Sequence, residues 1–549
     1  MTMISCSSCL RFALLVAAAS VASCGGVGSN PLPAGSGTTV TTRLGRAEGF
    51  RTEDGVVAFL GLPFAEPPVG GLRFRPPVPV RSWGGSLNAT TFGPACPQPV
   101  EAGSSLYLDQ SEDCLTLNVW TPAVDDRARP VMVWIHGGGW IYEGTEDRLY
   151  DGGRLAARGD VVVVSVEYRL GALGFTHLEG VEGSGNAGML DQKLALEWVR
   201  EHIGQFGGDP SNVTIFGESA GGMSVSALLG MPSAKGLFHK AIAQSNVASW
   251  ARRADYASRV TALLLEKVGA KNSEDLMSCP WPELLQAQIA VCRENFPEDL
   301  LYGPVVDGMV FPSPPVQAVR EGMSGEIPLL LGTTRDEARY WIMENPLLAL
   351  PFPPQLLFVF VPVAGRAIPD DRSLEEVVTL YRRAHPDFPP NFVALAAATD
   401  IFFRMPVLRF AEAQLNYQPD NVFVYRFDRP PPNPAAPFFD LGAAHGSELA
   451  FVFDRAEGWP ELYGDGVPSG LVEQIMDAWI AFARTGDPNH PGLPVWPAYK
   501  MSRRPVMIFD TTRTAPTSAV VDDPDAPTRS FWDGIPFDGV RPAMLPGDL

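Results

Sequence analysis

The chain has 549 residues, 46% of them hydrophobic and 19% charged, which is enough apolar material for a large core and excludes global disorder. Its formal net charge of -20 would repel phosphate backbones, and no Lys- or Arg-rich stripe reverses that charge locally, so we expect no nucleic-acid binding. The signals along the chain form one continuous α/β pattern, which predicts one large domain with long insertions.

The N-terminus has the features of an export signal. A single positive charge at Arg11 precedes a short apolar run over residues 12–22, so we expect a signal peptide at residues 1–23. The run ends in Val-Ala-Ser-Cys-Gly, which resembles the bacterial lipoprotein box and predicts that Cys24 is lipidated. Conventional cleavage near the same small residues is the alternative.

Export also determines where we expect the protein to act. Residues 24–39, rich in Gly, Ser and Pro, would form a flexible tether, and residues 40–549 would form the folded domain. We expect a bacterial cell-envelope protein that contacts the membrane only through its lipid anchor, or else a secreted or periplasmic soluble protein. No pattern indicates an oligomeric state.

Four cysteines follow Cys24, an even number in a compartment that permits disulfides. Pairing of sequence neighbours predicts two bridges, Cys96 with Cys114 and Cys279 with Cys292. Four buried free thiols are the alternative.

Apolar runs bounded by turn residues predict the core of the fold. They indicate buried, mostly parallel strands at residues 131–135, 161–166, 213–216 and 241–244, with further strands at 329–331 and 422–427. Helical spacing of apolar residues predicts helices at 190–203 and 471–484. Strands that alternate with helices are typical of a doubly wound α/β fold.

Two apolar, proline-rich stretches interrupt this pattern, at residues 346–363 and 430–434. Prolines break the first stretch too often for a membrane-spanning helix. We interpret it as a wall or lid over a pocket, with an ordinary packed loop and helix as the alternative.

A candidate nucleophile stands in the pattern G-x-S-x-G, at Ser219 between Gly217 and Gly221. The predicted strand at 213–216 precedes it, and small residues follow that can open a tightly packed helix. Small flanking residues permit the sharp strand-to-helix turn that exposes such a serine. The pattern alone is weak evidence for a nucleophile, and a glycine-rich turn with a purely structural role is the alternative.

A second glycine-rich loop supplies candidate hydrogen-bond donors. The predicted strand at 131–135 leads directly into His136-Gly137-Gly138-Gly139, where backbone N–H groups can approach a substrate. We assign an oxyanion hole to the N–H groups of Gly138, Gly139 and Ala220. A phosphate-binding loop is disfavoured because no G-K-[ST] follows.

The acid and the base should follow the serine along the chain. His445 is the best candidate base, because it lies in a small-residue loop behind the predicted strand at 422–427. The strand at 329–331 leads into a loop with two adjacent carboxylates, Asp336 and Glu337, and the residues alone do not choose between them.

Together these residues resemble the type-B carboxylesterase and cholinesterase family. The matching motifs are Gly61-Leu62-Pro63-Phe64-Ala65, Ser111-Glu112-Asp113-Cys114-Leu115-Thr116-Leu117-Asn118, His136-Gly137-Gly138-Gly139, Phe216-Gly217-Glu218-Ser219-Ala220-Gly221-Gly222 and Gly442-Ala443-Ala444-His445. Several separated motifs in the right order are far more specific than any one of them. The resemblance implies an α/β-hydrolase fold, with a central, mostly parallel twisted sheet flanked by helices and with long loop and helical insertions around the active-site gorge.

The resemblance also implies residue roles. It implies that Glu337 is the acid, that both local disulfides form, and that residues 40–549 are a catalytic domain. It further implies two buried ion pairs that hold loops near the site, Arg73 with Glu112 and Arg169 with Asp191; exposed surface charges are the alternative.

These features predict a serine carboxylesterase that acts on a small-molecule ester through an acyl-enzyme and needs neither metal nor organic cofactor. The loop between Cys96 and Cys114 is short and contains Tyr107 but no tryptophan, which argues against a choline-ester specialist. Alternatives are an amide, lactone or thioester substrate, or a lipid-anchored binding or adhesion protein without activity.

Overall fold

The computed structural model describes residues 37–535 and 537, apart from 101–106, 108, 247–250, 295–300, 345, 351–371, 433–439, 465, 510 and 513–514. The expected signal peptide, Cys24 and most of the tether lie outside the described residues. So do residues 351–363 and 433–434 of the two proline-rich stretches. Predictions about these segments stay predictions.

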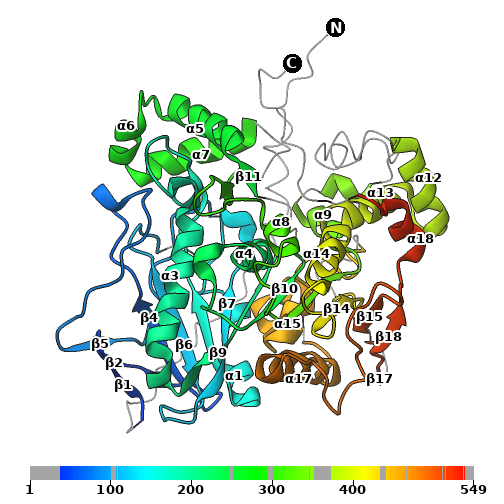
Figure 1. The fold of residues 1–549 in the computed structure, drawn as a ribbon, viewed down its shortest axis with the longest axis horizontal. Helices are drawn as coiled ribbons and strands as arrows, with labels where there is room; N and C mark the ends of the chain where they lie inside the picture. Colours follow the sequence, from blue (N-terminus) through cyan, green and yellow to red (C-terminus); the bar gives the residue numbers. More distant parts are fainter. Residues whose placement is uncertain are drawn as a thin grey trace, which may run out of the picture.

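One sheet of eleven strands runs through the middle of the fold (Figure 1). Its order is β18-β15-β14-β13-β10-β9-β7-β8-β6-β4-β3. Every neighbouring pair from β8 to β15 is parallel, and the outer pairs are antiparallel, so the predicted mostly parallel sheet is confirmed. The strands are β3 (Phe50–Arg51), β4 (Val57–Pro63), β6 (Thr116–Thr121), β7 (Arg129–Ile135), β8 (Val162–Val166), β9 (Gly208–Glu218), β10 (Lys240–Gln244), β13 (Leu329–Thr334), β14 (Val422–Phe427), β15 (Pro505–Phe509) and β18 (Ala519–Asp522).

The central strands are buried along their whole length, as β7 and β8 show. Four of the five residues of β8 are valine, whose branched side chain suits a strand that is covered on both faces. The start of β9 differs from the prediction. It begins at Gly208 rather than at residue 213, because a register shift in β7 lets Gly208 pair with Arg129.

Helices cover both faces of the sheet. Helices α3 (Ala187–His202) and α4 (Ala220–Leu229) lie together on one face and are seen in front of the strands in Figure 1. Helices α1 (Gly153–Gly159) and α17 (Ser469–Thr485) lie together on the other. The two helices predicted from apolar spacing are α3 and α17, so both predictions are confirmed.

The insertions form two helical groups at the top of the view in Figure 1. One contains α5 (Ala254–Val268), α6 (Ser273–Ser278) and α7 (Trp281–Glu294). The other contains α12 (Leu374–Ala384), α13 (Pro390–Thr399) and α14 (Met405–Leu415).

A π-helical turn, Asp400–Arg404, joins α13 to α14. The combined helix Pro390–Leu415 is long and apolar enough to cross a membrane by length and composition, but 89% of its most apolar window is buried inside the fold. Such burial is typical of a core helix. The π-helical turn is a separate feature, and turns of this kind are frequent at functional sites.

The structure forms the first predicted disulfide, Cys96–Cys114, with a Cα–Cα distance of 5.1 Å. The second, Cys279 with Cys292, is not formed, and that prediction is wrong. Cys279 precedes α7, whereas Cys292 lies eleven residues beyond Trp281 in the same helix. At about 1.5 Å per residue, Cys292 lies roughly 16 Å along the helix from Trp281. The two Cα steps of about 3.8 Å from Trp281 back to Cys279 cannot shorten this to the roughly 7 Å that a bridge allows.

Both ion pairs implied by the resemblance are present and buried. Arg73 donates to Glu112 through two nitrogens at 2.6 and 2.5 Å, and also to the carbonyl oxygen of Cys279. Arg169 donates to Asp191 at 2.8 and 2.7 Å. Planar two-point contacts of this kind fix the angle between the loops that they join.

Candidate active site

Ser219 occupies the turn between β9 and α4, with φ 55° and ψ -125°. A positive φ is rare for a residue with a side chain, and the neighbouring glycines show why the turn stays tight. A Cβ at Gly221 would lie 2.0 Å from the carbonyl oxygen of Ile135, and one at Gly217 would lie 2.6 Å from the backbone of Gly221. The turn is therefore the strained strand-to-helix elbow that the sequence predicts.

The glycine-rich loop after β7 lies against this serine. A Cβ at Gly137 would be 3.3 Å from the Cβ of Ser219. Gly138 and Gly139 have φ values of 79° and 61°, left-handed conformations that favour glycine. Tyr168 fixes the loop by donating from its hydroxyl to the carbonyl of His136 at 2.9 Å.

Of the two predicted carboxylates, Glu337 contacts the histidine. Its Oε2 lies 2.6 Å from Nδ1 of His445, and both side chains are buried. The other oxygen, Oε1, accepts hydrogen bonds from Ser245 Oγ at 2.6 Å and from the Thr334 backbone N–H at 2.7 Å. Three donors therefore hold one carboxylate.

Asp336 has a different task. Its Oδ2 accepts from the Ala443 N–H at 3.0 Å and from Arg335 Nε at 2.9 Å. A Cβ at Gly442 would lie 2.2 Å from the same oxygen, so glycine allows the two loops to meet. Asp336 thus joins the acid loop to the loop that carries His445.

Nε2 of His445 points toward the nucleophile turn. It lies 3.2 Å from Oε1 of Glu218, the residue before Ser219. Among the described residues no hydrogen bond joins Ser219 to His445. The structure therefore brings the serine turn, His445 and Glu337 to the carboxyl ends of neighbouring strands, with Glu218 between histidine and serine turn.

Buried charge shapes this site. Burial lowers the pKa of His445, but the negative charges of Glu218 and Glu337 outweigh it and raise the pKa above its usual value. Burial raises the pKa of Glu218 well above its usual range, but the positive charge of His445 opposes that rise, so each group supports the charged form of the other. Burial and the charge of Glu337 raise the pKa of Glu448 to about 7. The cluster therefore carries fewer negative charges than its carboxyl groups would in water.

Sequence reasoning missed two of these acids. Glu448 lies three residues after His445 and accepts from Gln244 Nε2 at 3.1 Å. Glu143 follows the glycine-rich loop and accepts from the Tyr150 hydroxyl at 2.8 Å, and burial raises its pKa to about 7. Their closeness in sequence to the histidine and the glycines was the only available signal.

Aromatic rings surround His445. The ring centroids of Tyr340, Trp341 and Phe403 lie 5.8, 6.2 and 4.9 Å from the imidazole. These three rings form an aromatic wall against the imidazole. Among the described residues, no group of three or more His, Cys, Asp or Glu side chains is placed to hold a metal ion.

The model of the carboxylesterase family matches residues 36–532 of this chain. The chain belongs to the carboxylesterase family. As a carboxylesterase it is a carboxylic-ester hydrolase, as the sequence predicted.

Individual carboxylesterases resemble the chain over nearly its whole length. It is 39% identical to a para-nitrobenzyl esterase of Bacillus subtilis over 89% of this chain and 97% of that protein. It is 35% identical to a phenmedipham hydrolase of Pseudarthrobacter oxydans over 83% of this chain and 92% of that protein. A crystal structure of a Geobacillus stearothermophilus carboxylesterase superposes with a TM-score of 0.80 at 39% identity, over 90% of this chain and all of that one. The predicted α/β-hydrolase fold is thereby confirmed.

Proposed function

We propose that the chain hydrolyses carboxylic esters through a triad of Ser219, His445 and Glu337. The observation that carries the proposal is the 2.6 Å contact between Glu337 and His445 beside a serine held in a strained elbow. Nucleophile, base and orienting acid are the parts that such a triad needs.

In the proposed reaction, His445 takes the hydroxyl proton as Ser219 attacks the ester carbonyl. The N–H groups of Gly138, Gly139 and Ala220 stabilise the oxyanion. His445 then gives its proton to the departing alcohol, which leaves an acyl-enzyme. Water attacks that ester with His445 again as base, and the carboxylic acid and free serine are released.

The proposal requires a rotation of the histidine or serine side chain. Nε2 of His445 now faces Glu218, and the serine proton must reach that nitrogen. Hydrogen bonds at catalytic sites are often loose in the free enzyme and tighten only in the substrate complex. Glu218 supports the charged form of His445 during that step.

A direct test separates this proposal from its rivals. The purified protein should hydrolyse a short-chain nitrophenyl ester, and an organophosphate should label Ser219. Ser219→Ala should abolish both results. If the wild type and Ser219→Ala are equally inactive toward esters, the protein is better explained as a non-catalytic binding protein. If the wild type hydrolyses only amides, lactones or thioesters, those compounds are its substrate class. Esters with graded acyl chains would then define the substrate class.

We also propose that the protein is exported and held at the bacterial cell envelope through lipidated Cys24. The apolar run and the small residues before Cys24 support this. Mass spectrometry of the mature N-terminus tests it: a diacylglycerol-modified Cys24 is expected, and an unmodified terminus beyond Cys24 would contradict lipidation.

A further inference from the structure

A buried arginine reaches the loop that carries Glu337. Arg404 ends the π-helical turn between α13 and α14, and only 9% of it is exposed. Its Nη1 pairs with Asp400, its Nη2 donates to the carbonyl oxygen of Arg335 at 2.8 Å, and its Nε lies 3.4 Å from Asp525. One guanidinium thus joins a helix, the acid loop and a segment near the C-terminus.

The carbonyl that Arg404 holds stands two residues before Glu337. The same loop is fixed by backbone hydrogen bonds from Arg335 to Phe427 at 2.9 Å and from Asp336 to Ala443 at 2.9 Å. These contacts fix the two residues that lead into Glu337, whose carboxylate meets His445.

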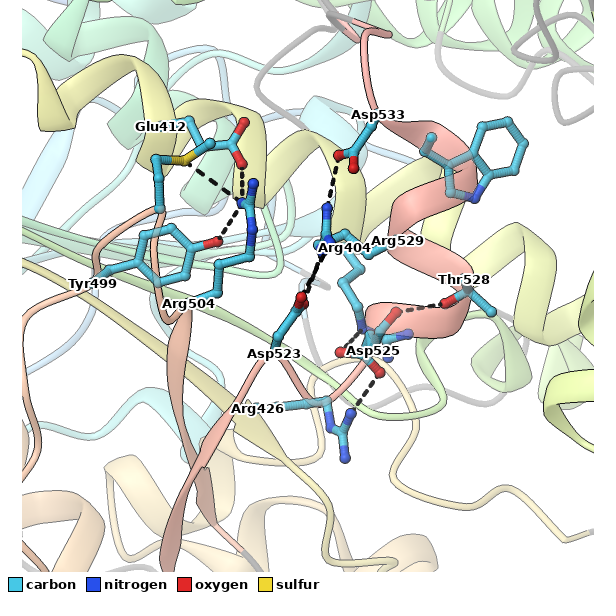
Figure 2. A network of polar contacts seen from close by, with 12 residues as sticks. Arg404, Glu412, Arg426, Tyr499, Arg504, Asp523, Asp525, Thr528, Arg529 and Asp533 are labelled. Carbon is cyan, nitrogen blue, oxygen red and sulfur yellow. Dashed lines mark hydrogen bonds and ion pairs between the residues drawn. The ribbon is translucent and has the colours of Figure 1, made fainter.

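Arg404 also reaches residues 523–533, which we call the C-terminal segment, through its ion pair with Asp525. Figure 2 shows Asp525 between Arg404 and Arg426, and Arg426 Nη1 donates to its Oδ1 at 2.7 Å. A second path runs from Trp532, whose Nε1 donates to the Tyr381 hydroxyl at 2.9 Å. That hydroxyl donates to Asp400 at 2.5 Å, so both paths meet at the π-helical turn.

The π-helical turn also contacts the histidine directly. Phe403, the residue before Arg404, lies with its ring centroid 4.9 Å from the ring of His445. A shift of this turn would therefore act on both partners of the Glu337–His445 contact.

We propose that Arg404 is a positioning residue, through which the C-terminal segment holds the loop of Glu337 in register with His445. The inference rests on the proposed role of Glu337 as the orienting acid. Arg404 touches neither substrate nor reacting atoms. It acts by fixing the backbone from which Glu337 extends, and a displacement of about 1 Å at such a site can cost roughly 100-fold in rate.

Arg529 is a matched control. It is equally buried, with 8% exposed, and pairs with Asp523 at 2.7 Å and Asp533 at 2.7 Å (Figure 2). Its described ion pairs stay within the C-terminal segment and do not reach the acid loop. Removing Arg404 takes one partner from Asp400 and one from Asp525, and removing Arg529 takes one partner from Asp523 and one from Asp533. The partners of Arg404 are the more buried pair, so kcat is compared per folded molecule, and only the removal of Arg404 frees the acid loop.

The experiment compares Arg404→Met with Arg529→Met in the full-length protein. For each variant, melting temperature, folded fraction, kcat and KM are measured with one nitrophenyl ester. We expect Arg404→Met to lower kcat by about 10- to 100-fold with KM nearly unchanged. Arg529→Met should keep kcat per folded molecule within about two-fold. Equal kcat per folded molecule in the two variants would overturn the proposal.

A milder pair covers the case in which Arg404→Met does not fold. Asp525→Asn weakens the anchor of Arg404, and Asp523→Asn weakens that of Arg529; only the first should lower kcat, and equal values would overturn the proposal. Glu337→Gln tests the triad assignment separately from the positioning role of Arg404. If it retains activity, the triad assignment fails; if it is inactive while Asp525→Asn has normal kcat, only the inference about Arg404 fails.

Discussion

Replacing Glu337 by glutamine would keep the shape of the side chain and change one hydrogen bond. Oε1 accepts from Ser245 Oγ and from the Thr334 N–H, so the amide oxygen must take that place. The NH₂ group then faces Nδ1 of His445, which Oε2 now contacts at 2.6 Å. Nδ1 must become the acceptor, and the ring proton moves to Nε2, where it blocks transfer from Ser219.

The expected cost is that of a wrong histidine tautomer, about 10⁴-fold in kcat. This corresponds to about 5.5 kcal/mol of transition-state stabilisation. The assay is hydrolysis of a nitrophenyl ester at neutral pH, with circular dichroism to verify folding. Asp336→Asn is the matched control, because Asp336 contacts the histidine loop and not the imidazole. A loss of less than ten-fold for Glu337→Gln, or a larger loss for Asp336→Asn, would contradict the role of Glu337 in fixing the histidine tautomer.

Three further predictions concern pH and stability. Burial lowers the pKa of His445, whereas the charge of Glu218 raises that pKa. Glu218→Gln should therefore lower the pKa of His445 and move the acidic limb of the kcat/KM profile to lower pH. An acidic limb that does not move would contradict this prediction. Arg169→Met leaves Asp191 buried and unpaired and should lower the free energy of unfolding by about 3–5 kcal/mol in denaturant titrations, whereas exposed Arg503→Met should cost less than about 1 kcal/mol. Reduction of the disulfide described above should cost about 3 kcal/mol in the same assay, and an unchanged midpoint would contradict a stabilising bridge.

Local patterns predicted the core because its strands obey local rules. The valine-rich run of β8 is buried on both faces, and the glycines around Ser219 permit one sharp turn. Both features depend on side chains within a few positions of each other, which is what a sequence displays.

The failures concern contacts between distant segments or the exact path of a helix. The choice between Asp336 and Glu337 depends on where the loop of His445 lies, which neighbouring residues do not encode. Closeness in sequence suggested that Cys279 meets Cys292, but a continuous helix separates them. Glu448 and Glu143 became visible as active-site acids only when their loops were placed beside the serine turn.

The backbone at Ser219 has a consequence for the evolution and engineering of this chain. A left-handed φ at a residue with a side chain costs of order 1–3 kcal/mol, and glycine would relieve that cost. Ser219→Gly should therefore melt at a higher temperature than Ser219→Ala. Selection for stability alone would remove the hydroxyl from this position, so the reaction persists only while selection for turnover opposes the gain in folding free energy.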